Sequence, residues 1–224
     1  MALLSRCPSL IGCMPPGYSC LEKARMCLNA QATNMLTNHG GMCLLYKTTF
    51  SACIVPLPVY KTFEELAVYL HSAGLNLLAI VVYRPGFTTV SCAFFDEFED
   101  VLERTATFAS PIVILGDINI HLDAVTDLNT TKFLSSLESH DLVQHVVGPT
   151  HTDGHTFDVL ITHSDVRVMT LNAEEPKLSG SDTRSSHQNL SVGKKTHLSS
   201  QCQNVAGGAF LTKTVSPMIL CDPN

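Results

Sequence analysis

The chain has 224 residues, of which 45% are hydrophobic and 15% are charged, and its formal net charge is −6 at pH 7. This length and composition allow one substantial globular domain and exclude a disordered chain. The acidic balance lacks the basic surplus that is typical of nucleic-acid-binding surfaces, so contact with a polyanion would need a local basic patch or a bound cation.

The cysteines indicate a reducing compartment. Nine are present, with no CxxC pair and no Cys-His spacing typical of a metal site, so we expect free thiols. Arg6 interrupts the apolar start of the chain, and no run approaches the roughly 18 to 20 apolar residues of a membrane span. We therefore expect an intracellular protein, nuclear or cytoplasmic, that is neither secreted nor held in a membrane.

The first half of the chain changes in pattern near residue 39. Residues 1–38 are poorly patterned, whereas "GGMCLLYKTTF" (40–50) and "CIVPLPVY" (53–60) predict two strands, the second at a sheet edge because of its prolines. Residues 62–70 fit a helix or a strand. The run "LNLLAIVVYRP" (75–85) is typical of a buried strand that a proline ends.

Two amphipathic helices are predicted. In "SCAFFDEFEDVLERTATF" (91–108), aromatic and aliphatic residues recur at steps of three and four, and Ser91 is suited to cap the helix. A second, shorter pattern of this kind covers residues 131–140.

Strands are predicted between and after these helices, at residues 111–115, 142–148 and 155–163. Alternation of strands and helices indicates an α/β fold whose sheet is covered by helices. From Glu174 onward the chain is Ser-rich, which predicts loop with at most one short strand, and residues 193–224 are expected to be an unstructured or degraded tail.

The stretch "SPIVILGDINIHLD" gives the first candidate functional residues. Its apolar run leads directly into Gly116-Asp117-Ile118-Asn119. In α/β sheets, ligands bind at the carboxyl ends of strands, so Asp117 and Asn119 are candidates. The alternative is an Asp and an Asn that only cap a turn.

Six segments in this order carry a family resemblance: "NHGGMCLLYK", "VVYRPG", "FFDEFEDVLE", "PIVILGDINIHLD", "HDLVQHVVGPTH" and "GHTFDVLITHSD". Together they resemble the endonuclease domain of non-LTR (LINE-type) retrotransposons, within the endonuclease/exonuclease/phosphatase superfamily. The resemblance covers about residues 38–170. It implies a two-sheet α/β sandwich of the deoxyribonuclease and abasic-endonuclease type over residues 39–192.

The resemblance implies a chemistry as well as a fold. Members cleave a phosphodiester bond of DNA with a water and a divalent metal, usually Mg²⁺ with Mn²⁺ as an alternative. The cation would neutralise the charge that develops on the phosphorane and on the leaving oxygen. Nicking would leave a 3′-hydroxyl that primes a reverse transcriptase, which in an intact element would be encoded downstream.

The resemblance also assigns roles to individual residues. Asp117 would hold the nucleophilic water, and Asn119 would hydrogen-bond the phosphate. Tyr83 of "VYRP" would donate to a phosphate oxygen, and Asp158 of "HTFDVLIT" would orient a histidine or the metal. Asp117 and Asp158 are thus the expected metal ligands, and we expect these four side chains to converge at one mouth of the sheet.

Near its end the sequence departs from the family pattern. The usual Ser-Asp-His motif is interrupted: Asp182 follows a serine, and Ser186-His187 comes four residues later. His187 remains a candidate, but Ser186 cannot supply the carboxylate that would raise its pKa.

A second departure lies near the start of the chain. Nothing before Gly40 resembles the usual Asn strand or the metal-binding Glu-(Ser/Thr)-Trp strand, no tryptophan is present, and Glu22 is the only acidic residue in that part. We therefore expect a domain that is incomplete at its N-terminus, as in a truncated transposon copy, with weak or no activity.

Two alternative functions stay open: a phosphatase or phosphodiesterase of the same superfamily, and a non-catalytic transposon remnant. For metal sites of another kind, the spacing of His151 and His155 would suit a zinc-binding helix, but Pro149 and Gly154 make a loop there, which disfavours zinc. Asp123 is expected to be a solvated carboxylate at a strand end.

Overall fold

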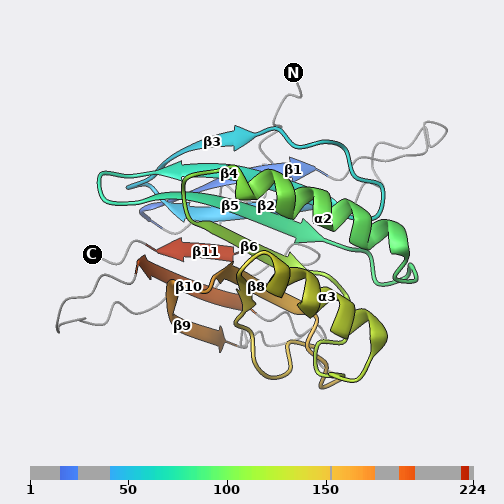
Figure 1. The fold of residues 1–224 in the computed structure, drawn as a ribbon. Coiled ribbons are helices and arrows are strands. Elements are labelled where there is room, and N and C mark those ends of the chain that lie inside the picture. The colour runs from blue at the N-terminus through green and yellow to red at the C-terminus, as the bar shows by residue number, and fades with distance from the viewer. Residues whose placement is uncertain (1–15, 25–40, 152, 175–186, 195–217, 222–224) are drawn as a thin grey trace, which may run out of the picture.

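The structure is a computed structural model that describes residues 16–24, 41–151, 153–174, 187–194 and 218–221. The described residues form two sheets and two helices (Figure 1). The strand order is β3-β4-β5-β6-β8-β7 in the six-stranded sheet and β1-β2-β11-β10-β9 in the five-stranded sheet. The predicted α/β fold with a sandwich of two sheets is confirmed.

The six-stranded sheet contains most of the predicted strands. Its members are β3 (Ser51–Val55), β4 (Glu64–His71), β5 (Asn76–Tyr83), β6 (Ile112–Asp117), β8 (Asp158–His163) and β7 (Leu142–Gln144). Strands β5 and β6 run parallel, and all other neighbours in this sheet are antiparallel. A parallel pair needs a crossover, which a helix supplies here.

The five-stranded sheet contains strands that the sequence did not predict. Its members are β1 (Tyr18–Ala24), β2 (Gly41–Lys47), β11 (Met218–Cys221), β10 (His187–Lys194) and β9 (Val166–Glu174). Strands β1 and β11 lie within the segment described from its sequence as poorly patterned and within the expected tail, respectively. Both strands pair with β2, so a distant partner supplies the order that their own sequence lacks. The domain boundaries themselves stay predictions.

Both predicted helices are present. Helix α2 (Cys92–Ala106) starts after Ser91, whose side chain accepts a hydrogen bond from the Phe94 N–H at 3.4 Å. Helix α3 (Leu128–Ser139) begins before the predicted Thr131, because the Asp127 carboxylate caps it. Within the described residues, no helix has the length and apolar content that a membrane span requires.

The six-stranded sheet is buried on both faces. One face packs against α2 and α3, which lie side by side on it in Figure 1, and the other faces the five-stranded sheet. Strand β5 shows the alternation: Leu78, Ile80 and Val82 join the helix-side core, and Leu77, Ala79 and Val81 join the core between the sheets. This double burial explains the continuous apolar run in the sequence.

Three strand predictions are refined. The strand predicted at residues 53–60 is β3, which forms a sheet edge as expected but ends at Val55, ahead of the first proline. Residues 62–70, which fitted two structures, form β4. The strand predicted at residues 142–148 already ends at Gln144.

Gly116 is needed for the close approach of β5 and β6. Its φ is +143°, and a Cβ there would lie 1.8 Å from the Val82 carbonyl oxygen. We expect Gly116→Ala to lower the free energy of unfolding by about 2 kcal/mol or more, because the backbone of β5 must shift. Urea denaturation measures this change. Gly74→Ala, with open space around its Cβ, is the control and should change stability by less than about 1 kcal/mol; equal stabilities would contradict this packing.

Candidate functional site

Three predicted site residues lie in one row across the six-stranded sheet. Tyr83 ends β5, Asp117 ends β6 and Asp158 begins β8, and the register pairs Tyr83 with Asp117 and Asp117 with Asp158. Side chains paired in this way point to the same face. Leu115, two residues before Asp117, packs between the sheets, so the row faces the mouth of the sandwich.

Glu64 belongs to the same row and was missed from the sequence. It is the first residue of β4 and pairs with Tyr83, so that a third carboxylate lies at this edge of the sheet. The signal is absent from local sequence, because residues 62–70 fit a helix equally well and only the register places Glu64 opposite Tyr83.

Asn119 lies beside Asp117 in a conformation suited to asparagine. Its φ is +49°, a left-handed value at which Asn is enriched. Its backbone N–H donates to Oδ1 of Asp117 at 2.9 Å, and its Nδ2 donates to the Arg84 carbonyl at 2.7 Å. A Cβ on Gly86 would come within 2.5 Å of the Asn119 Oδ1. The glycine thus lets the loop after β5 lie against the loop after β6.

Arg84 holds these two loops together, and the sequence reasoning missed it. The residue is 3% exposed. Its guanidinium donates to the carbonyl of Ile118 at 2.6 Å, of Asn119 at 2.6 Å and of Thr88 at 2.7 Å. An arginine at the end of a buried strand was the available signal. Its two partners in the loop after β6, the carbonyls of Ile118 and Asn119, however, lie more than thirty residues away in the sequence.

Burial raises the pKa of Asp117. Desolvation raises the pKa of its carboxyl from 3.8 to about 6, although hydrogen bonds from Asn119 and the charge of Arg84 act in the opposite direction. Burial also lowers the pKa of Arg84, against the charges of Asp117 and Tyr83. A carboxylate with a pKa near neutrality is suited to act as a general base.

The remaining predicted residues lie elsewhere. Asp182 lies outside the described residues. His187 is the first residue of β10 in the five-stranded sheet, where it pairs with Glu174 of β9. Its role as a site residue stays a prediction.

Three metal-ligating side chains come within 4.8 Å of one another at two places in the described part of the chain. One group contains His121, Asp123 and His155, and the other contains Cys20, Glu22 and Cys43. Neither group includes a member of the row at the mouth of the sandwich.

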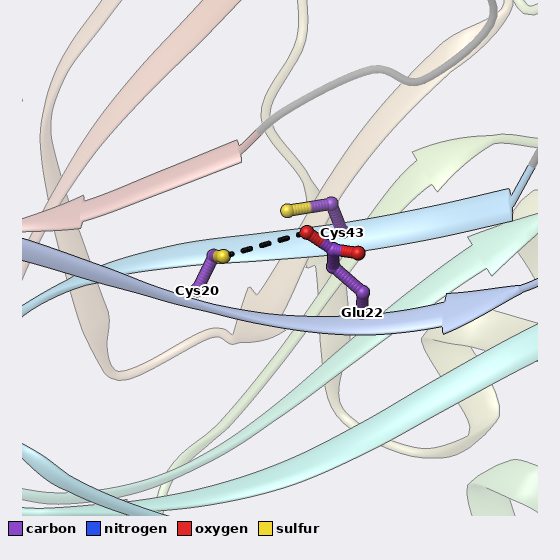
Figure 2. Close-up of side chains that lie close together, drawn as sticks. All are labelled: Cys20, Glu22 and Cys43. Atoms are coloured by element: carbon purple, nitrogen blue, oxygen red, sulfur yellow. Dashed lines mark hydrogen bonds between the residues drawn. The ribbon is translucent and has the colours of Figure 1, made fainter. Parts of the chain in front are cut away.

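The cysteine group lies between β1 and β2 (Figure 2). Cys20 donates from Sγ to Oε1 of Glu22 at 3.7 Å, and Glu22 pairs across the strands with Cys43. Burial, and after it the proximity of Cys20 and Glu22, raises the pKa of Cys43 above its ordinary value. Burial thus favours the protonated form of this thiol in the metal-free protein.

Four described cysteines have free thiols, as predicted: Cys20, Cys43, Cys53 and Cys92.

No family model matches the sequence. No curated protein matches it either. Among solved structures, the chain is similar to the endonuclease domain of TRAS1, a telomere-specific non-LTR retrotransposon, with 13% identity over 61% of this chain and 65% of that one (TM-score 0.48). It is also similar to the catalytic domain of human Nocturnin, with 17% identity over 72% of this chain and 65% of that one (TM-score 0.48).

A third similar structure is an endonuclease/exonuclease/phosphatase family protein from Bacteroides thetaiotaomicron, with 11% identity over 76% of this chain and 72% of that one (TM-score 0.42). The chain thus spans 65% of the length of the first two structures. The similar structures include members of the family that the motifs predicted. Likenesses at this level concern the arrangement of strands and helices alone, so the roles of the site residues rest on their own geometry.

Proposed function

We propose that this chain is a metal-dependent phosphodiesterase of the endonuclease/exonuclease/phosphatase type that nicks DNA, as a non-LTR retrotransposon endonuclease domain does. The observation that carries the proposal is the row of Tyr83, Asp117 and Asp158 at one end of the six-stranded sheet. Chemistry in α/β folds collects at strand ends of this kind. The assignment to this family in the proposal rests on the sequence motifs that predicted these residues.

The residues of the row have separate roles in this proposal. Asp117, with a pKa of about 6, is mostly anionic at pH 7 and takes the proton of the attacking water. The hydroxyl of Tyr83 donates to a phosphate oxygen. Asn119 fixes Asp117 through its backbone N–H and lies beside the phosphate.

The donor set fits a hard cation. Asp117 and Asp158 offer carboxylate oxygens in adjacent positions of the sheet, and Mg²⁺ is commonly bound by one or two carboxylates together with waters and phosphate oxygens. These two residues would hold Mg²⁺ or Mn²⁺, and Glu64 adds negative charge to the same row. When bound, the cation supplies charge neutralisation at the phosphate.

The proposed substrate is DNA, and the proposed product carries a 3′-hydroxyl that a reverse transcriptase can extend. We expect cleavage to be slow. The sequence lacks the usual upstream glutamate, and Ser186 replaces the carboxylate partner of His187. Each such loss costs roughly tenfold or more in rate, because about 1.4 kcal/mol of transition-state stabilisation is a factor of ten.

Relaxation of supercoiled plasmid tests the proposal. The purified chain should nick plasmid slowly in Mg²⁺ or Mn²⁺, and EDTA should stop the reaction. Ligation of the nicked product without prior phosphatase treatment detects the 3′-hydroxyl. A complete lack of metal-dependent nicking at high protein concentration would favour the non-catalytic remnant, and hydrolysis of small phosphate esters without nicking would favour the phosphatase alternative.

A further inference from the structure

His121, Asp123 and His155 lie on two segments that run beside each other beyond the ends of β6 and β8. The N–H of Ile118 donates to the Phe157 carbonyl at 3.1 Å, and the N–H of Leu122 donates to the Thr156 carbonyl at 3.0 Å. These backbone hydrogen bonds, together with the one from the Thr156 N–H to Oδ1 of Asp123, hold the two segments beside each other. The group is therefore positioned before any ligand binds.

The three side chains present their polar atoms to one another. Nδ1 of His155 lies 3.0 Å from Oδ2 of Asp123, and the rings of His121 and His155 stand edge to face with centroids 4.4 Å apart. One ligand atom from each residue lies within 4.8 Å of the other two. Phe157 packs against both imidazoles and limits their rotation.

Two hydrogen bonds fix the orientation of the Asp123 carboxylate. Its Oδ1 accepts a hydrogen bond from the Thr156 N–H at 2.9 Å, so Oδ2 is the oxygen that faces His155. Asp123 is exposed, as expected from the sequence, and its two hydrogen bonds also fix the orientation of its carboxylate. A backbone N–H that orients a ligating carboxylate is a common support of metal sites.

We propose that His121, Asp123 and His155 form a binding site for a transition-metal cation of the zinc type. Two imidazoles and one carboxylate suit Zn²⁺ or Co²⁺, whereas Mg²⁺ prefers oxygen ligands alone. Ligand atoms at about 2.0 to 2.2 Å from a tetrahedral zinc ion lie roughly 3.3 Å from one another. The Asp123–His155 pair is already at 3.0 Å, and the exposed His121 needs only a small movement.

The site is distinct from the proposed nicking site and does not depend on it. A bound metal would link residues 118–123, which follow Asp117, to residues 155–157, which precede Asp158. Three protein ligands leave a fourth position for water, since the group is open to solvent. Sequence spacing suggested only His151 with His155, whereas the fold brings His121 to His155 instead.

Titration with Co²⁺, followed by visible absorption and calorimetry in the absence of nucleic acid, tests the proposal. The full chain should bind one Co²⁺ at these residues with visible d–d bands and no thiolate charge-transfer band. Zn²⁺ should displace it, and excess Mg²⁺ should not. His121→Ala and His155→Ala should each weaken binding at least tenfold.

His151→Ala is the matched control, because His151 also packs against Phe157 but lies outside the ligand group. This variant should bind Co²⁺ as the wild type does, and circular dichroism should show that all variants are folded. Two results would overturn the proposal: binding that survives both His121→Ala and His155→Ala, or a thiolate band that shows the metal at cysteines. Failure of the wild type to bind Co²⁺ would overturn it as well.

Discussion

Replacement of Asp117 by asparagine should reduce Mg²⁺-dependent nicking at least a hundredfold. The amide keeps the shape of the side chain and can still accept the Asn119 N–H bond that Oδ1 of Asp117 now accepts at 2.9 Å. It can neither take a proton nor supply an anionic metal ligand. Loss of a general base typically costs about 10²- to 10⁴-fold in rate. The measurement is the initial rate of plasmid nicking under single-turnover conditions.

The same substitution should stabilise the protein at neutral pH. The native pKa of Asp117 is about 6, above its ordinary value of 3.8, so between these values the native state binds the proton more tightly than the unfolded state. Stability therefore falls as pH rises through this window, and the full cost of the buried charge is present above it. Asp117→Asn removes that cost, which is about 2 to 3 kcal/mol.

Urea denaturation in EDTA at several pH values measures this effect, and Asp153→Asn is the control for both experiments. Asp153 has a side chain that is 74% exposed, so its substitution should change neither nicking nor stability. Nicking that persists in Asp117→Asn would indicate a contaminating nuclease or another base. A stability gain of Asp117→Asn over the wild type that does not grow between about pH 4 and pH 6 would contradict the raised pKa.

The core elements could be predicted because their signals are local. A strand buried on both faces, such as β5 or β6, reads as a continuous apolar run, and α2 shows its 3.6-residue period in its own sequence. The strands β1 and β11 lack such signals. Met218 of β11 pairs with Leu44 of β2, and no pattern within four residues can reveal a partner so distant in the chain.

Some residues of the candidate site likewise have a signal in their local sequence, and others do not. Asp117 and Asn119 could be found because they directly follow an apolar run, and Tyr83 because "VYRP" resembles the family motif. Glu64 could not be found, since its place beside Tyr83 depends on the pairing of β4 with β5. The group that contains His121 depends likewise on two loops that only the folded chain brings together.

Replacement of Arg84 by alanine should give the largest loss of stability among the substitutions considered, about 3 to 5 kcal/mol. The side chain is 3% exposed and donates to three loop carbonyls, those of Ile118, Asn119 and Thr88. Alanine would leave the buried Ile118 carbonyl without its donor, would remove the part-buried bonds to Asn119 and Thr88, and would open a cavity in place of the guanidinium. Asp117 would also lose the nearby positive charge that opposes the rise of its pKa.

Arg84→Lys separates charge from geometry. A lysine keeps the positive charge, but a single ammonium group cannot reproduce the planar fork that reaches three carbonyls from one position. We therefore expect Arg84→Lys to be clearly less stable than the wild type and to nick DNA more slowly, because the loop that carries Asn119 is displaced from Asp117. Urea denaturation and the plasmid assay measure the two effects.

Arg104→Ala is the control for the loss of an arginine. Arg104 lies on α2 with a side chain that is 50% exposed and forms an ion pair with Asp100, one helical turn away. Such exposed pairs contribute little, so the unfolding midpoint should hardly change. If Arg84→Ala were as mild as Arg104→Ala, the carbonyls of Ile118 and Asn119 would have to find other donors, and the loop after β6 would not depend on Arg84. A large loss of stability in Arg84→Ala with unchanged nicking would instead show that the arginine supports the fold without positioning Asn119.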